Sequence, residues 1–364
     1  MTKSGELISQ LLRYYLWEDS PAPDRDIFNK LSTQEWSELH SLSLREGVSA
    51  MILDAMISAE IDIPRQVKMK FILSTSKIEN KYAEKVKTIS WLENIYSENG
   101  IDMMILKGVG LAALYPVPNH RPCSDVDIWL FGKQAEADHI LRQKYGIPIN
   151  EGQHHHTVFH INGVMVENHY DFIEQHSRSS RRKMEEHLKR FSECESPIKT
   201  EIAGTSVYTP APNLNALFLI IHAGSHFAAE NISIRHLTDW AVFLKHYKER
   251  VDWEQLHQIG EQFGFKHFLE CLNAMCINFL GMPEKLASCR SLERNLIDRA
   301  LDDVLEYKQK NIPKNFIKGW IFRINRRISN LWKQKIVYND SHIGAFFLSF
   351  LAHIIHPKQW KKRK

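Results

Sequence analysis

The chain has 364 residues, of which 43% are hydrophobic and 25% are charged. These proportions are typical of folded globular proteins, so they exclude a largely disordered chain, a collagen-like repeat and a simple coiled coil. The length exceeds what one compact core usually holds, which predicts two or three packed units. The net charge is +4, but it is unevenly distributed along the chain.

The first nineteen residues carry Glu6 and Arg13 within their apolar stretch and lack a small-residue cleavage site. They therefore do not resemble a signal peptide. The five cysteines form neither a paired framework nor a C-x-x-C metal motif, which is typical of a reducing compartment. We expect a cytoplasmic protein.

Residues 1–99 are expected to be helical, because apolar residues recur at spacings of three and four. Ser32 and Glu35 have the spacing of a capping box. Pro64 opens a further long helical pattern, which Gly100 would end.

The pattern changes at Ile101–Leu106, a short apolar run that predicts a strand. A tight turn at Lys107-Gly108 and a helix over Val109–Tyr115 are expected to follow. A second strand is predicted at Asp125–Leu130, where acidic or aromatic residues alternate with aliphatic ones. Alternation places Asp125 and Asp127 together on the face away from the core.

Asn162-Gly163 separates two alternating runs and predicts a β-hairpin with a two-residue turn. Pairing residue 161 with residue 164 fixes the register. One face then carries His156, Val158, His160, Met165, Glu167 and His169. The other, expected to be buried, carries Phe159, Ile161, Val164, Val166 and Tyr170.

Beyond Pro210 helical spacing returns in four segments, which are Asn213–Ala229, Arg235–Tyr247, Trp253–Phe263 and Lys266–Leu280. The predicted fold class is α+β, with a small mixed sheet flanked by helical regions. The predicted units are an N-terminal helical region (1–99), a core with metal-binding carboxylates (100–175), a C-terminal helical domain (176–306) and a basic amphipathic tail (307–364).

Two carboxylates on one strand and a third on a neighbouring strand can hold a pair of Mg²⁺ ions and leave room for phosphates. Asp125, Asp127 and Glu167 fit this pattern. The alternative is an ordinary solvent-exposed strand face. The turn at Lys107-Gly108 lies where a strand meets a helix N-terminus, so it could approach a phosphate, with Lys107 supplying a cation.

Several segments together resemble a known family. Residues 106–116 read Leu-Lys-Gly-Val-Gly-Leu-Ala-Ala-Leu-Tyr-Pro and are followed by Arg121 and by Ser-Asp-Val-Asp-Ile-Trp at 124–129. These segments, Glu-Asn-His-Tyr at 167–170 and Arg-His-Leu-Thr-Asp-Trp at 235–240 are similar to an uncharacterised bacterial nucleotidyltransferase family within the DNA polymerase β-like superfamily. The resemblance covers about residues 30–280.

The resemblance implies transfer of a nucleoside monophosphate from an NTP, expected to be ATP, with release of pyrophosphate. Asp125, Asp127 and Glu167 would be catalytic and would bind two Mg²⁺ ions, or Mn²⁺ in their place. The acceptor is expected to be a hydroxyl of a small molecule or of a glycan or lipid-linked precursor.

The remaining candidates surround these acids. The nucleotide-binding candidates are Lys107, Gly108, Arg121 and Ser124, and Arg121 could instead only balance the local negative charge. The substrate-binding candidates are His169, His226, Arg235 and Asp239. His222 and His226 share one helix face, as do Arg235 and Asp239, so an ion pair bracing the helices is the structural alternative.

Two further functions compete with this prediction. His156, His160 and His169 share a face with Glu167 and could form the Zn²⁺ site of a hydrolase. A non-catalytic nucleotide-binding or scaffold protein is the other alternative.

Residues 307–364 hold 14 Lys and Arg against one Asp, a net +13. Aromatic and aliphatic residues are interleaved with Lys318, Arg323, Lys333 and other cations, as in a helix lying on an anionic membrane surface. Two interpretations stay open for this tail: peripheral contact with the inner face of the membrane through residues 313–364, or ordinary apolar helices packed on the folded body with their charges in solvent. No specific nucleic-acid partner is expected. The longest uncharged apolar run, 343–355, is shorter than the roughly 20 residues of a membrane span.

Overall fold

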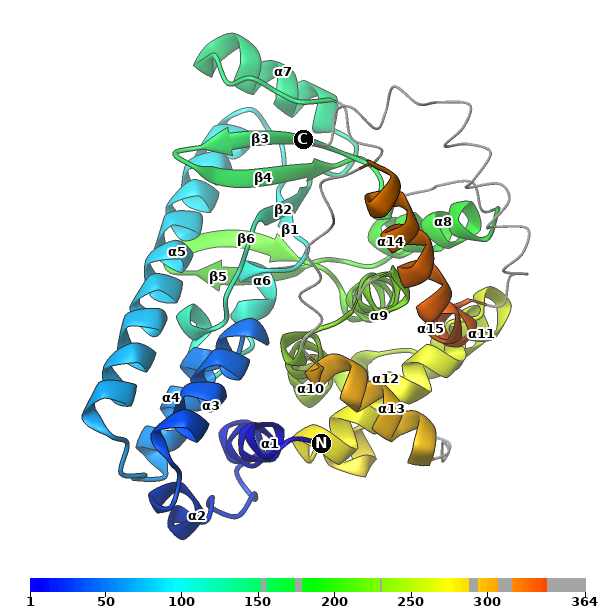
Figure 1. Cartoon of the computed structure of the whole chain (residues 1–364). Coiled ribbons are helices and arrows are strands. Elements are labelled where there is room, and N and C mark those ends of the chain that lie inside the picture. Colours follow the sequence, from blue (N-terminus) through cyan, green and yellow to red (C-terminus); the bar gives the residue numbers. More distant parts are fainter. Residues whose placement is uncertain (152–154, 174–178, 230, 288–293, 307–315, 339–364) are drawn as a thin grey trace.

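The computed structural model describes residues 1–151, 155–173, 179–229, 231–287, 294–306 and 316–338. Helices make up most of this part of the chain, and a mixed six-stranded sheet lies among them (Figure 1). The predicted α+β fold is therefore confirmed.

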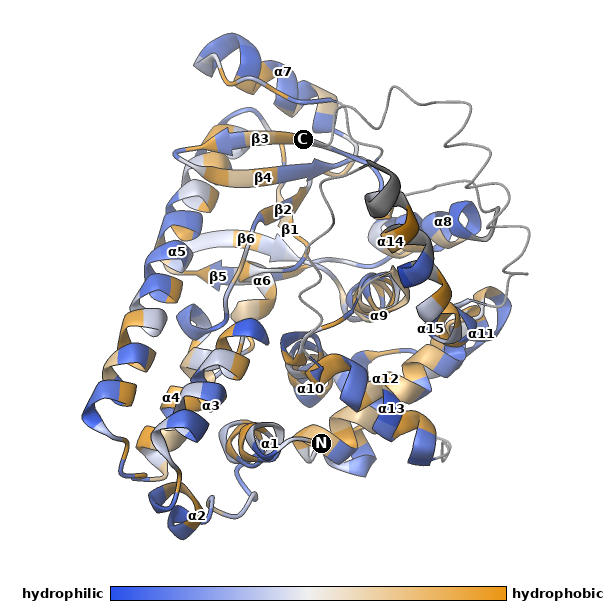
Figure 2. Ribbon diagram, viewed as in Figure 1, coloured by the Kyte–Doolittle hydropathy of each residue, from blue (hydrophilic) through white to orange (hydrophobic). Residues whose placement is uncertain are grey.

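The N-terminal region is helical, as predicted. Its helices are α1 (Lys3–Leu16), α2 (Arg25–Asn29), α3 (Thr33–Arg45), α4 (Ser49–Ser58) and α5 (Arg65–Glu98). Ser32 and Glu35 form the expected capping box at the start of α3. Helix α5 follows Pro64 and runs along one side of the sheet (Figure 1). Hydrophobic and hydrophilic residues alternate along it (Figure 2). Its later part, with Ile89 and Leu92, packs with the sheet, and its first part, with Phe71, packs against α3 and α4.

The sheet has the strand order β3-β4-β2-β1-β6-β5. Strand β2 pairs in parallel with β4 and antiparallel with β1, and β1 pairs in parallel with β6. The strands are β1 (Met104–Ile105), β2 (Val126–Trp129), β3 (His156–Ile161), β4 (Val164–His169), β5 (Ile198–Ile202) and β6 (Thr205–Thr209).

The hairpin of β3 and β4 has the predicted register, with Ile161 opposite Val164. Phe159 and Val166 face each other on the buried side, as expected. The prediction for Tyr170 was wrong, because its side chain is 38% exposed. Strand β4 ends at His169, so alternation no longer governs the next residue.

The two faces of the sheet belong to different hydrophobic clusters. Val126, Ile128 and Leu130 pack with apolar residues of α5 and α7 (Gln134–Tyr145). Trp129 points to the other face and stacks on Phe172, with 4.0 Å between ring centroids. The second face is covered by the helices that follow the sheet, and the polar residues at its centre form the site described below.

Several elements differ from expectation. The Ile101–Leu106 run forms regular strand only at β1. Helix α6 (Val109–Ala112) ends before Tyr115, where Pro116 disfavours a further helical residue. Strands β5 and β6 belong to the sheet although they lie beyond residue 175.

The four helices predicted beyond Pro210 are confirmed to within one residue at each end. They are α9 (Pro212–Ala229), α10 (Ile234–Tyr247), α11 (Trp253–Phe263) and α12 (Lys266–Leu280). They gather on the side of the sheet away from α5 (Figure 1). Helix α8 (Ser179–Cys194) precedes them, and α13 (Arg294–Leu305) follows. The 3₁₀ turns are Pro118–His120, Lys248–Arg250 and Glu284–Leu286.

The described part of the basic tail forms α14 (Phe316–Ser329) and α15 (Leu331–Val337). The expectation that Lys333 is an interfacial cation was wrong, because Lys333 is buried and forms an ion pair with Asp303 of α13. Trp332 packs edge-on against Phe227 of α9, so α15 is part of the folded body. Residues 339–364 lie outside the described residues, and membrane contact stays a prediction. Within the described chain, no helix combines the length and apolar character of a membrane span.

Candidate active site

A cluster of acidic and histidine side chains lies on the second face of the sheet. The parallel pairing of β2 with β4 places Asp127 directly beside Glu167, and alternation points both side chains to the same face. One potential ligand atom from each of Asp127, Glu167 and His169 lies within 4.8 Å of the others. The predicted convergence of carboxylates from two strands is therefore present for Asp127 and Glu167.

His169 lies between the two carboxylates. Its Nε2 is 3.1 Å from Asp127 Oδ1 and 3.5 Å from Glu167 Oε2, and its Nδ1 donates to the carbonyl oxygen of Asp171 at 3.2 Å. Burial alone would lower the pKa of His169, but hydrogen bonds to Asp127 and Glu167 raise it to about 9. The imidazolium therefore supplies positive charge between the carboxylates.

Asp127 is almost completely buried, with 1% of its surface exposed. Burial alone would raise its pKa, but attraction to Lys107 and the hydrogen bond to His169 hold the pKa well below its usual value. Asp127 Oδ1 receives both contacts, whereas Oδ2 has no hydrogen-bond partner among the described residues. A buried carboxylate oxygen without a partner is rare in folded proteins, and it fits a cation ligand.

The donor set can hold a divalent cation. Two carboxylates provide the oxygen ligands that Mg²⁺ and Mn²⁺ prefer. His169 could add Nε2 as a ligand only if an ion displaced the Nε2 proton, and its Nδ1 already bonds a backbone carbonyl, as is common for histidines at metal sites.

Asp125 lies outside this close group. Its Oδ1 accepts a hydrogen bond from Ser124 Oγ at 2.7 Å, and its charge contributes to the raised pKa of Lys107. The groups of three or more potential ligands found among the described residues do not include Asp125. Its predicted role as a metal ligand stays a prediction.

The Lys107-Gly108 turn joins the carboxylates to the helical side of the site. Gly108 has φ +59° and ψ −113°, a conformation that residues with a Cβ rarely adopt. Lys107 Nζ lies 3.1 Å from Asp127 Oδ1 and 3.2 Å from His222 Nε2. Burial alone would lower the pKa of Lys107, but attraction to the three nearby carboxylates raises it, so Lys107 is a cation.

A cavity of about 220 Å³ opens beside this turn, between the start of β2 and helices α9 and α10. It is lined by candidate site residues that lie far apart in the sequence. Those lining it are Lys107, Gly108, Arg121 and Ser124 of the nucleotide-binding set, Asp125, and His226, Arg235 and Asp239 of the substrate-binding set. His169 is not among the lining residues and belongs to the carboxylate cluster instead.

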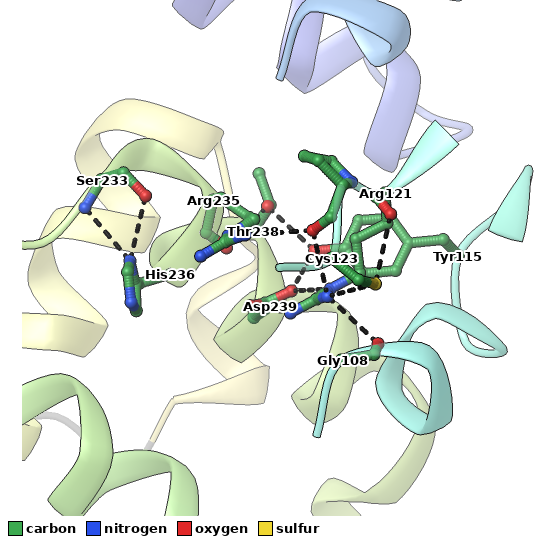
Figure 3. A network of polar contacts seen from close by, with 10 residues as sticks. Gly108, Tyr115, Arg121, Cys123, Ser233, Arg235, His236, Thr238 and Asp239 are labelled. Carbon is green, nitrogen blue, oxygen red and sulfur yellow. Dashed lines mark hydrogen bonds and ion pairs between the residues drawn. The ribbon is translucent and has the colours of Figure 1, made fainter. Parts of the chain in front are cut away.

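Arg121 and Asp239 form a buried two-pronged ion pair (Figure 3). Arg121 Nε and one terminal nitrogen each donate to Asp239 at 2.7 Å, and the other terminal nitrogen donates to the Gly108 carbonyl at 3.0 Å. Tyr115 Oη also donates to Asp239 at 2.7 Å. The pair therefore ties the Gly108 turn to α10, and it is Arg121, not Arg235, that pairs with Asp239.

The alternative zinc site at His156, His160 and His169 is not assembled. His160 is exposed and lies four residues along the strand from His156, about 13 Å at the usual rise per residue. His155 takes its place in a close group with His156 and His169. His154 lies outside the described residues. His156 has a lowered pKa because of burial, so its ring is neutral.

Sequence analysis missed several residues of the site. His155 lies beside the carboxylate cluster, and Tyr115 and Thr238 belong to the network around Asp239. His236 lines the cavity and accepts from the backbone of Ser233 (Figure 3). The Ser-x-x-His spacing is a weak form of a capping box and was the available signal for His236.

Three comparisons relate the chain to known proteins. A crystal structure of an antigenic nucleotidyltransferase-like protein from Paracoccidioides brasiliensis is similar over 44% of this chain and 76% of that one, at 16% identity and a TM-score of 0.32. That likeness is too weak to bear on function. No curated protein matches the chain. The family model described as "Uncharacterised nucleotidyltransferase" matches residues 32–281, more than half of the chain and including the carboxylate cluster and the cavity. The chain therefore belongs to this uncharacterised nucleotidyltransferase family.

Proposed function

We propose that the protein is a Mg²⁺-dependent nucleotidyltransferase that moves a nucleoside monophosphate from an NTP to a hydroxyl acceptor. The acceptor class is a small molecule or a glycan or lipid-linked precursor, and Mn²⁺ could replace Mg²⁺. The observation that carries the proposal is the meeting of Asp127 and Glu167 on adjacent parallel strands, with Asp127 Oδ2 buried and without a partner among the described residues.

Different residues of the chain would have different roles in such a reaction. Asp127 and Glu167 would hold the ions, and His169 and Lys107 keep the Asp127 carboxylate ionised and oriented. Divalent ions bound there lower the pKa of an attacking hydroxyl and neutralise charge on the transferred phosphoryl group. Lys107 and the Gly108 turn would place the NTP phosphates at the cavity, where Ser124 and Asp125 form the rim nearest to β2.

The resemblance of the sequence to the wider DNA polymerase β-like superfamily supports this proposal, since it implies two acids on one strand and a third on its neighbour. The non-catalytic alternative predicts a chain that keeps the fold and loses the carboxylates. In this chain Asp127 and Glu167 are both present and lie side by side on adjacent strands. This favours the catalytic proposal.

The proposal predicts a labelled product. The purified protein is incubated with each of the four α-labelled NTPs, Mg²⁺ and a host-cell extract. We expect label from at least one NTP to move to an acceptor, transfer to stop when EDTA is added, and transfer to return with excess Mg²⁺ or Mn²⁺. Absence of both transfer and nucleotide binding for all four NTPs would contradict the proposal.

A further inference from the structure

The wall of the cavity formed by α9 and α10 is made largely of nitrogen-bearing side chains. His222, His226, Arg235 and His236 all line it. The rings of His222 and His236 lie nearly parallel, with 6.0 Å between their centroids. Which of these nitrogens carry a proton follows from their other hydrogen bonds.

His236 is a hydrogen-bond donor toward the cavity. The backbone N–H of Ser233 donates to His236 Nδ1 at 3.1 Å (Figure 3), so the proton of the neutral ring is on Nε2. Burial, followed by the nearby Arg235, lowers the pKa of His236 to about 3. The ring is therefore neutral near pH 7, with its tautomer fixed by the α10 cap.

His222 has the opposite tautomer for a similar reason. The Lys107 ammonium has no acceptor, so the 3.2 Å contact is donation from Lys107 to His222 Nε2. The proton of His222 is then on Nδ1. Burial and the Lys107 charge hold the pKa of His222 well below its usual value, so this ring also offers one fixed N–H.

Arg235 completes the wall with an unneutralised charge. One terminal nitrogen donates to the Pro122 carbonyl at 3.0 Å, but Nε is buried without an acceptor, and the described residues give Arg235 no ion pair. Both oxygens of the nearby Asp239 already accept from Arg121. A guanidinium that lines a cavity and has no carboxylate partner of its own suits binding of an anion there.

We infer that Arg235, His236 and His222 form a subsite for a phosphate group on the wall of the cavity that α9 and α10 provide. The three side chains present N–H donors from a charged fork and from two rings of fixed tautomer, and phosphate oxygens are acceptors that suit such a set. The cavity volume of about 220 Å³ is several times the roughly 30 Å³ that one molecule occupies in liquid water. It can therefore admit a phosphate group.

This subsite deepens the proposed function and rests on it for the identity of the ligand. A phosphate could come from the β- and γ-positions of the NTP, since Lys107 links the subsite to the carboxylate cluster. It could also come from a phosphate group on the acceptor. The two sources share one recognition chemistry and are separated by the experiment.

The test measures anion binding to the metal-free protein by isothermal titration calorimetry, with inorganic phosphate and with pyrophosphate. The variants are Arg235→Gln and His236→Asn. The asparagine retains an acceptor near the Nδ1 position for Ser233 and lacks the Nε2 donor. Arg65→Gln is the matched control, because Arg65 is an exposed arginine at the start of α5. Thermal melting confirms that each variant is folded.

We expect Arg235→Gln and His236→Asn each to weaken binding of the tighter anion by about tenfold or more, as for loss of a hydrogen bond to a charged group, and Arg65→Gln to change nothing. ATP and AMP titrations then identify the source. If the variants lose affinity for ATP and pyrophosphate but not for AMP, the subsite binds the phosphates of the NTP. If they lose affinity for inorganic phosphate alone, the subsite binds a phosphate group on the acceptor.

The inference is overturned if the wild-type protein binds neither anion, or if both folded variants bind like Arg65→Gln. Because the binding measurement needs neither metal nor turnover, it can contradict the phosphate subsite even if nucleotidyl transfer is observed. Conversely, transfer can fail while phosphate binding remains, so the two proposals are tested separately.

Discussion

Replacement of Asp127 by asparagine is expected to slow nucleotidyl transfer by about 10³-fold or more, since metal ions at such sites supply several kcal/mol of charge stabilisation in the transition state. The substitution removes the negative charge but keeps the size of the side chain. Asparagine Oδ1 can still accept from His169 and Lys107, which now contact Asp127 Oδ1. The measurement is the single-turnover rate with the reactive NTP and saturating Mg²⁺.

The matched control is Asp102→Asn, which removes an exposed carboxylate just before β1. This variant should transfer at the wild-type rate. Circular dichroism and thermal melting should show that both variants are folded. A folded Asp127→Asn variant with near-normal turnover would remove Asp127 from the reaction.

The second large effect concerns stability. Replacing Arg121 by methionine is expected to lower the free energy of unfolding by about 3–5 kcal/mol, the usual cost of leaving one partner of a buried ion pair alone. Arg121 and Asp239 are 4% and 7% exposed, so solvent cannot replace the lost contact. The Gly108 carbonyl would lose its donor as well. Urea denaturation at neutral pH measures the difference.

The exposed pair of Arg142 and Glu151 is the control, because its side chains are 43% and 66% exposed. Arg142→Met should cost less than about 1 kcal/mol. The double variant Arg121→Met/Asp239→Leu should recover part of the stability lost in Arg121→Met, because it removes the unpaired charge. Equal destabilisation by Arg121→Met and Arg142→Met would show that the buried pair contributes little.

The same pair predicts a dependence on pH. Burial alone would raise the pKa of Asp239, but attraction to Arg121 outweighs it and the pKa is lowered. A lowered pKa means that the stabilisation is present above the unfolded value of about 3.9 and is lost as the pH falls through the lower folded value. The stability difference between wild type and Arg121→Met should therefore shrink at about pH 3.

The parts of the fold that the sequence predicted are those set by local rules. Alternation and the two-residue turn at Asn162-Gly163 determined the register of β3 and β4, because a slip by one residue would expose Phe159 and Val166. The capping box at Ser32 marked the start of α3. These signals span only a few residues, so no tertiary information is needed.

Strands β5 and β6 show where local signals fail. Ala203 and Gly204 form their tight turn, with Ala203 at φ +47°. Strand β5 lies at the edge of the sheet and carries Lys199 and Glu201 on an exposed face. A polar edge strand has little of the apolar alternation that distinguishes a strand from a loop, and the pairing of β6 with β1 depends on contacts distant in sequence.

The sequence predicted those parts of the site that depend only on which face of a strand a residue occupies. Alternation and the resemblance predicted that Asp127 and Glu167 lie on neighbouring strands, and the parallel pairing of those strands is known only from the structure. The ion-pair partner of Asp239 could not be predicted in this way. Helical spacing suggested Arg235, whereas the partner is Arg121, which lies 118 residues away in the sequence. His155 was missed because its contact with the cluster depends on how the chain enters β3.

The central claim is that Asp127 and Glu167 bind the same divalent ion. Mn²⁺ binding measured by electron paramagnetic resonance, with Mg²⁺ as competitor, tests it most directly. We predict that the wild-type protein binds at least one Mn²⁺ that Mg²⁺ displaces, and that Asp127→Asn and Glu167→Gln each weaken this binding by about tenfold or more. Mn²⁺ binding unchanged in both folded variants, or absent from the wild-type protein, would contradict the claim.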